Sequence, residues 1–258
     1  MSVTSKELQA VFISRYIENG WYVIAGIGAG IQRAGVILAH LTHCPDLKIV
    51  MSDYFVDFLK DTEIGDFRSY TETGLKKNAE YMIPPEIRYE TACRIDLMFA
   101  GGMQIDRFGN TNLIGIGSDF KKIRLRGAGS IGATSMTSLV KRYIIFTNNH
   151  NKRTFVEKCD FISTIGWNKG GADAREKLGL LGEGPQYVIT PLCVMDFTEQ
   201  SKELRLKHLM PNVSLESVME NTGFSLVIPE KVERMPEPNE LELEVLRNRI
   251  DPSGILRR

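Results

Sequence analysis

Residues 21–51 read WYVIAGIGAGIQRAGVILAHLTHCPDLKIVM, and this stretch decides the fold class. Trp21–Ala25 is short and apolar, as a buried strand is. Ile31–His43 has apolar residues at helical spacing, and Leu47–Met51 is a second short apolar run. A strand, a helix and another strand in this order form a βαβ unit, in which the two strands are parallel. We therefore predict an α/β protein with an open, mainly parallel sheet flanked by helices.

The flanking sequence extends this pattern. Thr4–Glu7 has the pattern of a capping box, and the helix that it predicts stops at Gly20. Ser214 is predicted to cap a short helix, and Glu240–Ile250 is predicted to form the last one. Further strands of the same sheet are predicted at Ile95–Ala100, Tyr143–Thr147, Phe161–Ile165 and Tyr187–Thr190. The sequence thus predicts a single domain over residues 1–235 with a helical tail over residues 236–258.

Composition and charge exclude several classes of partner. The 258 residues are 43% hydrophobic, and 32 basic side chains balance 32 acidic ones, which favours neither nucleic acid nor a membrane as partner. No apolar stretch approaches the roughly 18–20 residues that span a bilayer. The start, MSVTSKELQAVF, has no apolar core of signal-peptide length, so we expect a cytoplasmic protein. The four cysteines form no CxxC pair, and no metal site is predicted.

Two glycine-containing stretches follow predicted strands. Residues 101–112 read GGMQIDRFGNTN, which suits a loop carrying a site at the carboxyl end of a strand; a tight structural turn is the alternative. Residues 26–30 read GIGAG, but the dinucleotide fingerprint GxGxxG fails because residue 31 is isoleucine. The backbone N–H groups of such a loop can still bind an anion or a carbonyl oxygen, and a plain turn is again the alternative.

A third stretch, residues 121–136, reads KKIRLRGAGSIGATSM. Lys122, Arg124 and Arg126 alternate with apolar residues, so a strand would place three cations on one face. Cations beside a glycine-rich backbone suit a ligand that carries phosphate or carboxylate, whereas the alternative is a solvated edge strand. His150, in NNHNKR, has no Cys or Asp at the spacing of a triad or metal site, and we interpret it as a structural or surface residue.

Taken together, these stretches resemble the class I coenzyme A transferase family, in particular the B-type subunits of glutaconate CoA-transferase and of steroid-ring-cleaving CoA-ester hydrolases. GGMQIDRFGNTN looks like the family loop GG-x-Q-x-D-x-x-G-N-x-N, in which Asp106 and the asparagines would hold the shape of an active-site wall. The resemblance implies a single domain of the CoA-transferase type, an acyl-CoA substrate and no cofactor beyond that coenzyme A. It also implies an A-type partner subunit, in a heterodimer or an α2β2 heterotetramer.

The resemblance further implies a set of site residues. The implied substrate-binding residues are Gly26, Gly28, Gly30, Gly101, Gly102, Gln104, Asn110, Gly127, Gly129 and Gly132. Arg124 and Arg126 are the candidates for binding the phosphates of coenzyme A.

One position departs from the family. Transferases of this class carry a nucleophilic glutamate just after the second strand, in V-E-S-G or a similar setting, where this chain has Val50-Met51-Ser52-Asp53. Methionine cannot act as that nucleophile, which leaves only Ser52 and Asp53 as nearby candidates. In the ring-cleaving hydrolases the working glutamate lies on the A-type subunit, so hydrolytic C–C or ring cleavage is the favoured reaction. The alternatives are CoA transfer between carboxylic acids, decarboxylation of an unsaturated dicarboxyl-CoA, and a non-catalytic CoA-binding role.

Overall fold

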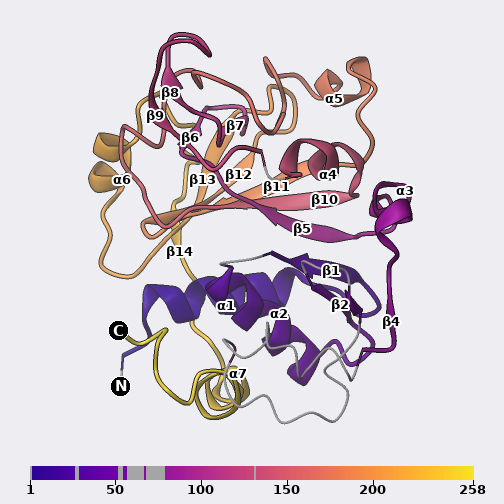
Figure 1. The fold of residues 1–258 in the computed structure, drawn as a ribbon. Helices are drawn as coiled ribbons and strands as arrows, with labels where there is room; N and C mark the ends of the chain where they lie inside the picture. The colour runs from indigo at the N-terminus through magenta and orange to yellow at the C-terminus, as the bar shows by residue number, and fades with distance from the viewer. Residues whose placement is uncertain (1, 27–28, 52–54, 57–66, 68–78, 131) are drawn as a thin grey trace. The chain divides into compact units, whose positions relative to one another are not determined.

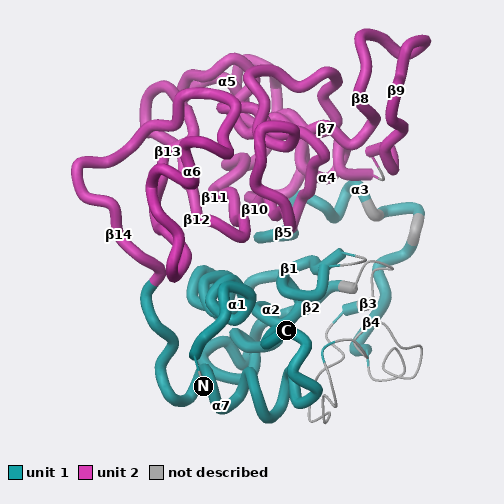
Figure 2. The backbone as a smooth tube through the Cα atoms, turned by 90° about the vertical axis from the view of Figure 1, so that its left-hand side faces the viewer, with its two compact units in different colours: residues 1–98, 236–258 teal, residues 99–235 magenta. Residues whose placement is uncertain are grey.

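The computed structural model describes residues 2–26, 29–51, 55–56, 67, 79–130 and 132–258 (Figure 1). The chain forms two compact units (Figure 2). Unit 1 comprises residues 1–98 and 236–258, and unit 2 comprises residues 99–235. The chain re-enters unit 1 at Pro236, where the sequence predicts the helical tail to begin.

Unit 1 contains the predicted βαβ unit. Its elements are β1 (Tyr22–Ala25), α2 (Gly30–Thr42) and β2 (Lys48–Met51), and the two strands pair in parallel with Ala25 opposite Met51. β5 (Leu97–Ala100) pairs in parallel on the other side of β1. Two short antiparallel strands, β3 (Phe55–Val56) and β4 (Tyr81–Met82), extend the order to β4-β3-β2-β1-β5. The predicted parallel arrangement is confirmed.

Helices pack around this set of strands. α1 (Ser5–Tyr16) begins with the predicted capping box between Thr4 and Glu7. It packs closely on α2, because a Cβ at Gly35 would lie only 2.6 Å from the carbonyl oxygen of Ala10. The short helices η3 (Pro85–Ile87) and α3 (Arg88–Ala92) lead into β5.

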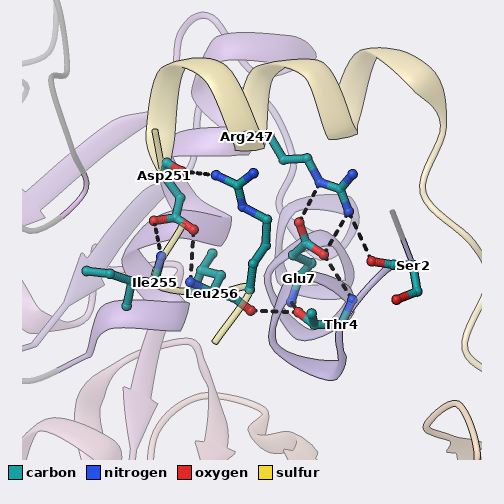
Figure 3. Close-up of polar contacts among 8 residues, drawn as sticks. Ser2, Thr4, Glu7, Arg247, Asp251, Ile255 and Leu256 are labelled. Atoms are coloured by element: carbon teal, nitrogen blue, oxygen red, sulfur yellow. Dashed lines mark hydrogen bonds and ion pairs between the residues drawn. The ribbon is translucent and has the colours of Figure 1, made fainter. Parts of the chain in front are cut away.

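The last segment of the chain, residues 236–258, forms ion pairs with α1. α7 (Glu240–Val245) continues into the π-helix η4 (Leu246–Ile250), and both pack against α2. The guanidinium of Arg247 donates to the buried carboxylate of Glu7 at 2.7 and 3.1 Å (Figure 3). Arg15 of α1 makes a second two-contact pair, with Glu242 at 2.8 and 2.7 Å. Residues 236–258 are therefore part of the framework of unit 1.

Unit 2 has its own strands. They are β10 (Arg142–Phe146), β11 (Gly184–Ile189), β12 (Cys193–Phe197), β13 (Leu204–Leu209) and β14 (Glu233–Arg234), which lie in that order. β10 and β11 are parallel, as are β13 and β14, whereas β12 pairs antiparallel with both of its neighbours. The α/β class with a mostly parallel sheet and flanking helices is confirmed, with antiparallel strands added at its outer positions.

Two hairpins and three short helices are the other elements among the described residues of unit 2. The hairpins are β6 (Gln104–Ile105) with β7 (Thr111–Asn112) and β8 (Gly115–Gly117) with β9 (Ile123–Arg126). The helices are α4 (Ala133–Leu139), α5 (Ala174–Lys177) and α6 (Leu215–Asn221), and the hydroxyl of Ser214 caps α6 as predicted. Among the described residues, no helix combines the length and the apolar character needed to cross a membrane.

The predicted strand at Phe161–Ile165 is wrong. This segment is irregular, and its one ladder contact is an isolated bridge between Thr164 and Thr111. Its backbone pairs with the β6–β7 hairpin instead, since Ser163 N–H donates to Thr111 O and Thr111 N–H donates to Thr164 O. A short apolar run does not distinguish a strand from such an irregular segment.

Candidate active site

The GGMQIDRFGNTN stretch leaves the carboxyl end of β5 and folds into the β6–β7 hairpin. The buried carboxylate of Asp106 closes the turn, because it accepts from Phe108 N–H at 3.0 Å, from Asn110 N–H at 3.1 Å and from Asn110 Nδ2 at 2.8 Å. Burial raises the pKa of Asp106, and the N–H donors of Asn110 and Phe108 oppose that shift. Gly109, at φ +69°, lets the chain reverse direction.

The amide side chains join this hairpin to its neighbours. Asn110 Nδ2 donates to Asn168 O at 2.7 Å, and Asn110 Oδ1 accepts from Gly166 N–H at 3.0 Å. Asn112 Nδ2 donates to Gln104 Oε1 at 2.7 Å, and the same oxygen accepts from Asp160 N–H. These three side chains are at least 95% buried. The prediction that Asp106 and the asparagines hold the loop in shape is confirmed, and Gln104 acts in the same way.

The structure brings the second glycine-rich loop of unit 2 against this hairpin. Gly127 N–H donates to Ile114 O and Gly129 N–H donates to Leu113 O, both at 2.8 Å. A Cβ at Gly127 would overlap the carbonyl oxygen of Leu113 and lie 2.7 Å from Met103 Sδ, so only glycine fits against this backbone. Gly101, Gly102, Gly127 and Gly129 therefore belong to two loops that are joined through Met103 and Leu113.

Gly129 and Gly132 differ from Gly127. Their φ angles are +83° and +77°, and a Cβ at either would meet no described atom within 4 Å. Each therefore faces open space while its backbone holds the left-handed conformation. Because the N–H groups of Gly127 and Gly129 are already bonded within the loop, neither is available to a ligand.

The site residues predicted from the first third of the chain lie in unit 1. The carbonyl oxygen of Gly26 accepts a hydrogen bond from Arg33 Nη2 at 3.3 Å. Gly30 is the first residue of α2. Met51 is the last residue of β2. Gly28, Ser52 and Asp53 lie outside the described residues.

The strand predicted from KKIRLR is confirmed as β9, but the single cationic face is not. Lys122 precedes the strand, and a register shift between Ile116 and Gly117 of β8 interrupts the regular pairing. Arg124, Leu125 and Arg126 are all exposed, so β9 is uncovered on more than one side.

Two supporting residues were missed from the sequence. Arg175 is 3% exposed, and its guanidinium donates to the carbonyls of Ile165, Gly166, Thr137 and Leu181. Ser163 Oγ accepts from Leu113 N–H at 2.7 Å. Both side chains fix loops that are distant in sequence, so no periodicity or local motif reveals them.

His150 is a structural residue, as predicted, and it is buried. Its Nδ1 lies 2.9 Å from Thr190 Oγ1, its Nε2 lies 3.1 Å from Thr222 Oγ1, and its ring stacks on Phe155. Both hydroxyls also donate to backbone carbonyls, that of Thr190 to Cys193 O at 3.0 Å and that of Thr222 to Val218 O at 2.8 Å. Burial lowers the pKa of His150 to about 4.

We expect this histidine to make the fold acid-sensitive. Its pKa is about 4 in the folded state and 6.5 in the reference state, so the unfolded chain binds more protons between these values. The stability is therefore fully present above pH 6.5 and is lost as pH falls toward 4. Urea unfolding should show a loss of about 2 kcal/mol at about pH 5 relative to about pH 7.5. Burial also lowers the pKa of His208, so His150→Gln should remove most of this difference and leave a smaller one; an unchanged difference in that variant would exclude His150 as its source.

The fold and these loops define an α/β protein with a candidate site walled by glycine-rich backbone after the carboxyl end of β5. The model of the coenzyme A transferase family matches residues 76–221, more than half of the chain. The chain belongs to the coenzyme A transferase family.

Curated relatives resemble the chain over almost its full length. It is 38% identical over 248 residues to the B-type subunit of 3-oxoadipate CoA-transferase from Pseudomonas knackmussii, covering 95% of this chain and 92% of that protein. It is 33% identical over 254 residues to the B-type subunit of glutaconate CoA-transferase from Acidaminococcus fermentans, covering 96% and 93%. The cholesterol ring-cleaving hydrolase IpdB from Mycobacterium bovis is 27% identical over 257 residues, covering 98% and 96%.

Solved structures agree with these relatives. Glutaconate coenzyme A-transferase from Acidaminococcus fermentans superimposes with a TM-score of 0.86 at 31% identity, covering 100% of this chain and 98% of that chain. The decarboxylase AibA/AibB shares the fold, with a TM-score of 0.83 at 22% identity, covering 99% and 98%. The predicted family and the assignment to an enzyme of the CoA-transferase family are confirmed.

Proposed function

We propose that the chain is the B-type subunit of a two-chain enzyme that cleaves a C–C bond or ring of an acyl-CoA ester by hydrolysis. The observation that carries this proposal is Met51 at the end of β2; the resemblance implies that a transferase of the family has its glutamate at this position. A thioether carries no proton to transfer and forms no anhydride with an acyl group. The carboxylate that the reaction requires, acting as general base, then comes from the A-type subunit.

CoA transfer between carboxylic acids is the second candidate. Sequence identity favours it. The B-type subunits of the two transferases are 38% and 33% identical to this chain, whereas the ring-cleaving subunit is 27% identical. In that reaction Asp53 or a group on the partner would replace the glutamate. Decarboxylation of an unsaturated dicarboxyl-CoA and a CoA-binding role without catalysis are the remaining alternatives.

The deciding experiment uses the co-expressed pair of subunits. Incubation with an acyl-CoA, with and without an acceptor carboxylate, separates hydrolytic cleavage from CoA transfer. Hydroxylamine or borohydride trapping followed by peptide mapping reports covalent adducts at residues 51–53. We expect cleavage without an acceptor, no adduct in this chain, and no turnover by this chain alone. An adduct on Asp53 or a strict need for the acceptor would establish transfer instead, and an inactive pair that binds CoA would leave the non-catalytic role.

We propose two groups of glycines as substrate-binding residues. Gly101, Gly102, Gly127, Gly129 and Gly132 belong to unit 2, and Gly26, Gly28 and Gly30 belong to unit 1. Gln104 and Asn110 stabilise the unit 2 loops, since both side chains are buried and form hydrogen bonds with neighbouring segments. The N–H groups of Gly127 and Gly129 are already bonded to backbone carbonyls of the same loops. A ligand would therefore accept hydrogen bonds from other N–H groups of these loops.

For the phosphates of coenzyme A we propose Arg124 and Arg126, because both are exposed beside the glycine-rich loop. Replacing either by alanine should raise KM by about three- to tenfold at unchanged kcat, as expected for an exposed charge-assisted contact. An acyl-pantetheine thioester, which has no phosphate esters of the nucleotide, should be turned over equally by variant and wild type. Arg153→Ala, at another exposed cation of unit 2, is the matched control. A higher KM toward both substrates would remove the two arginines from phosphate binding.

A further inference from the structure

The β8–β9 hairpin carries apolar side chains that unit 2 leaves uncovered. Phe120 is 71% exposed, Leu125 is 54% exposed, and Leu125 lies directly opposite Ile116 in the pairing of the two strands. Phe120 contacts Phe161, with ring centroids 4.7 Å apart, and the next residue, Ile162, is 46% exposed. We define Ile116, Phe120, Leu125, Phe161 and Ile162 as the hairpin surface. Contiguous exposed apolar groups of this kind mark interaction sites.

The hairpin is held at its base and at its turn, and it projects from unit 2 (Figure 2). Asn112 Nδ2 donates to Gly115 O, and Gly117 N–H donates to the carboxylate of Asp160. β8 and β9 form a two-stranded sheet of their own, and such a ribbon is marginally stable in water unless something packs on it. A covering surface would therefore both bury the apolar residues and stabilise the hairpin.

Charge indicates what can cover it. Apart from Arg124 and Arg126, which we propose for phosphate binding, Lys121 and Lys122 are exposed next to β9, and neither forms an ion pair within the part of the chain that the structure describes. The nearby acids, Asp119 and Asp160, each accept a backbone N–H, from Lys121 and Gly117, and neither forms an ion pair with these lysines in the described part of the chain. In a two-fold contact between copies of this chain, these cations would face one another and repel. The complementary partner is therefore apolar with surplus carboxylates.

We propose that the hairpin surface is the docking site for the A-type subunit, which presents an apolar patch bordered by carboxylates. The inference rests on the proposed two-chain enzyme, and it adds which surface of this chain makes the contact. Lys121 and Lys122 would steer the encounter, and the apolar residues would supply the buried contact.

The test compares two leucines of equal exposure. Leu125 lies in the hairpin surface, and Leu181 lies elsewhere in unit 2; both are 54% exposed. We expect Leu125→Asp and Phe120→Asp to weaken binding of the A-type subunit at least about tenfold, whereas Leu181→Asp leaves Kd unchanged. Lys121→Glu with Lys122→Glu should lower the association rate and its dependence on salt. Kd and mass are measured by sedimentation, and the melting temperature of each variant chain confirms folding.

The outcomes are separable from those of the proposed reaction. Wild-type Kd in folded Leu125→Asp, or weakening in Leu181→Asp to the same degree, would overturn the docking proposal. The proposal would also be overturned if the hairpin variants kept the two-chain complex but lost self-association of this chain. The same holds if they kept that complex but lost binding to anionic vesicles. A complex that depends on Leu125 but does not cleave acyl-CoA would support the docking site while refuting the proposed reaction.

Discussion

Replacing Gly129 by alanine is expected to lower kcat/KM of the two-chain enzyme by about a hundredfold. The residue has φ +83°, and its Cβ would enter open space beside the joined glycine loops. If that space receives the thioester, the added methyl group displaces it, and displacements of about 1 Å cost catalysis on this scale. The same backbone conformation in alanine costs roughly 1 kcal/mol of stability, which should appear as a small fall in melting temperature.

Gly179 provides the matched control. It has φ +66°, and a Cβ there would also meet no described atom within 4 Å, but it follows α5 rather than a site loop. Gly179→Ala should therefore carry the same strain penalty and leave kcat/KM per folded enzyme unchanged. Equal kinetics in the two alanine variants would remove Gly129 from the acyl site and leave it a turn residue.

Replacing Arg175 by methionine is expected to cost at least about 4 kcal/mol of stability. The guanidinium donates to four carbonyls at 3.0–3.3 Å, and methionine would leave these buried acceptors unpaired at roughly 1–3 kcal/mol each. Two of the carbonyls belong to Ile165 and Gly166, and Asn110 of the candidate site binds the N–H of Gly166. Loss of Arg175 should therefore loosen the site loop as well. Urea unfolding followed by circular dichroism measures the first effect.

Two further variants keep this prediction testable even if the methionine variant does not fold. Arg175→Lys retains the charge but not the planar fork, and it should recover only part of the stability. Lys177→Met removes a cation two residues away on the same helix, whose pair with Asp173 is exposed at 2.7 Å. That variant should unfold at nearly the wild-type urea concentration. A comparable loss in Lys177→Met would mean that α5 itself, rather than the buried guanidinium, is sensitive to substitution.

The parts that sequence predicts well are those in which a single segment determines its own structure. The βαβ unit follows from two apolar runs around an amphipathic helix, and the capping box at Thr4 and the cap at Ser214 are local hydrogen bonds. The inward roles of Asp106 and Asn110 also follow from their spacing, because an Asx side chain bonds backbone two to four residues ahead.

The rest depends on contacts between distant segments. β12 and β13 were not predicted. In the sequence of β13, LRLKHL, three basic side chains indicate an exposed segment, although the structure alternates buried and less buried residues there. In the segment 161–165 the polar residues Ser163 and Thr164 are buried by hydrogen bonds to β7, whereas Ile162 is exposed, which is the reverse of what an apolar strand would show. Arg175 reads as a surface cation of a short helix until the four carbonyls around it are known.

The discontinuity of unit 1 has a consequence for biosynthesis. The ribosome delivers α1, β1, α2 and β2 first, but their partners α7 and η4 emerge only after all of unit 2. Until then Glu7 and Arg15 lack Arg247 and Glu242, and the α2 surface that α7 will cover is accessible. Unit 2 can acquire its structure during translation, whereas the amino-terminal half of unit 1 must be kept from misassociation through more than half of elongation. A nascent chain arrested near residue 235 should accordingly recruit chaperones that a chain released in full does not need.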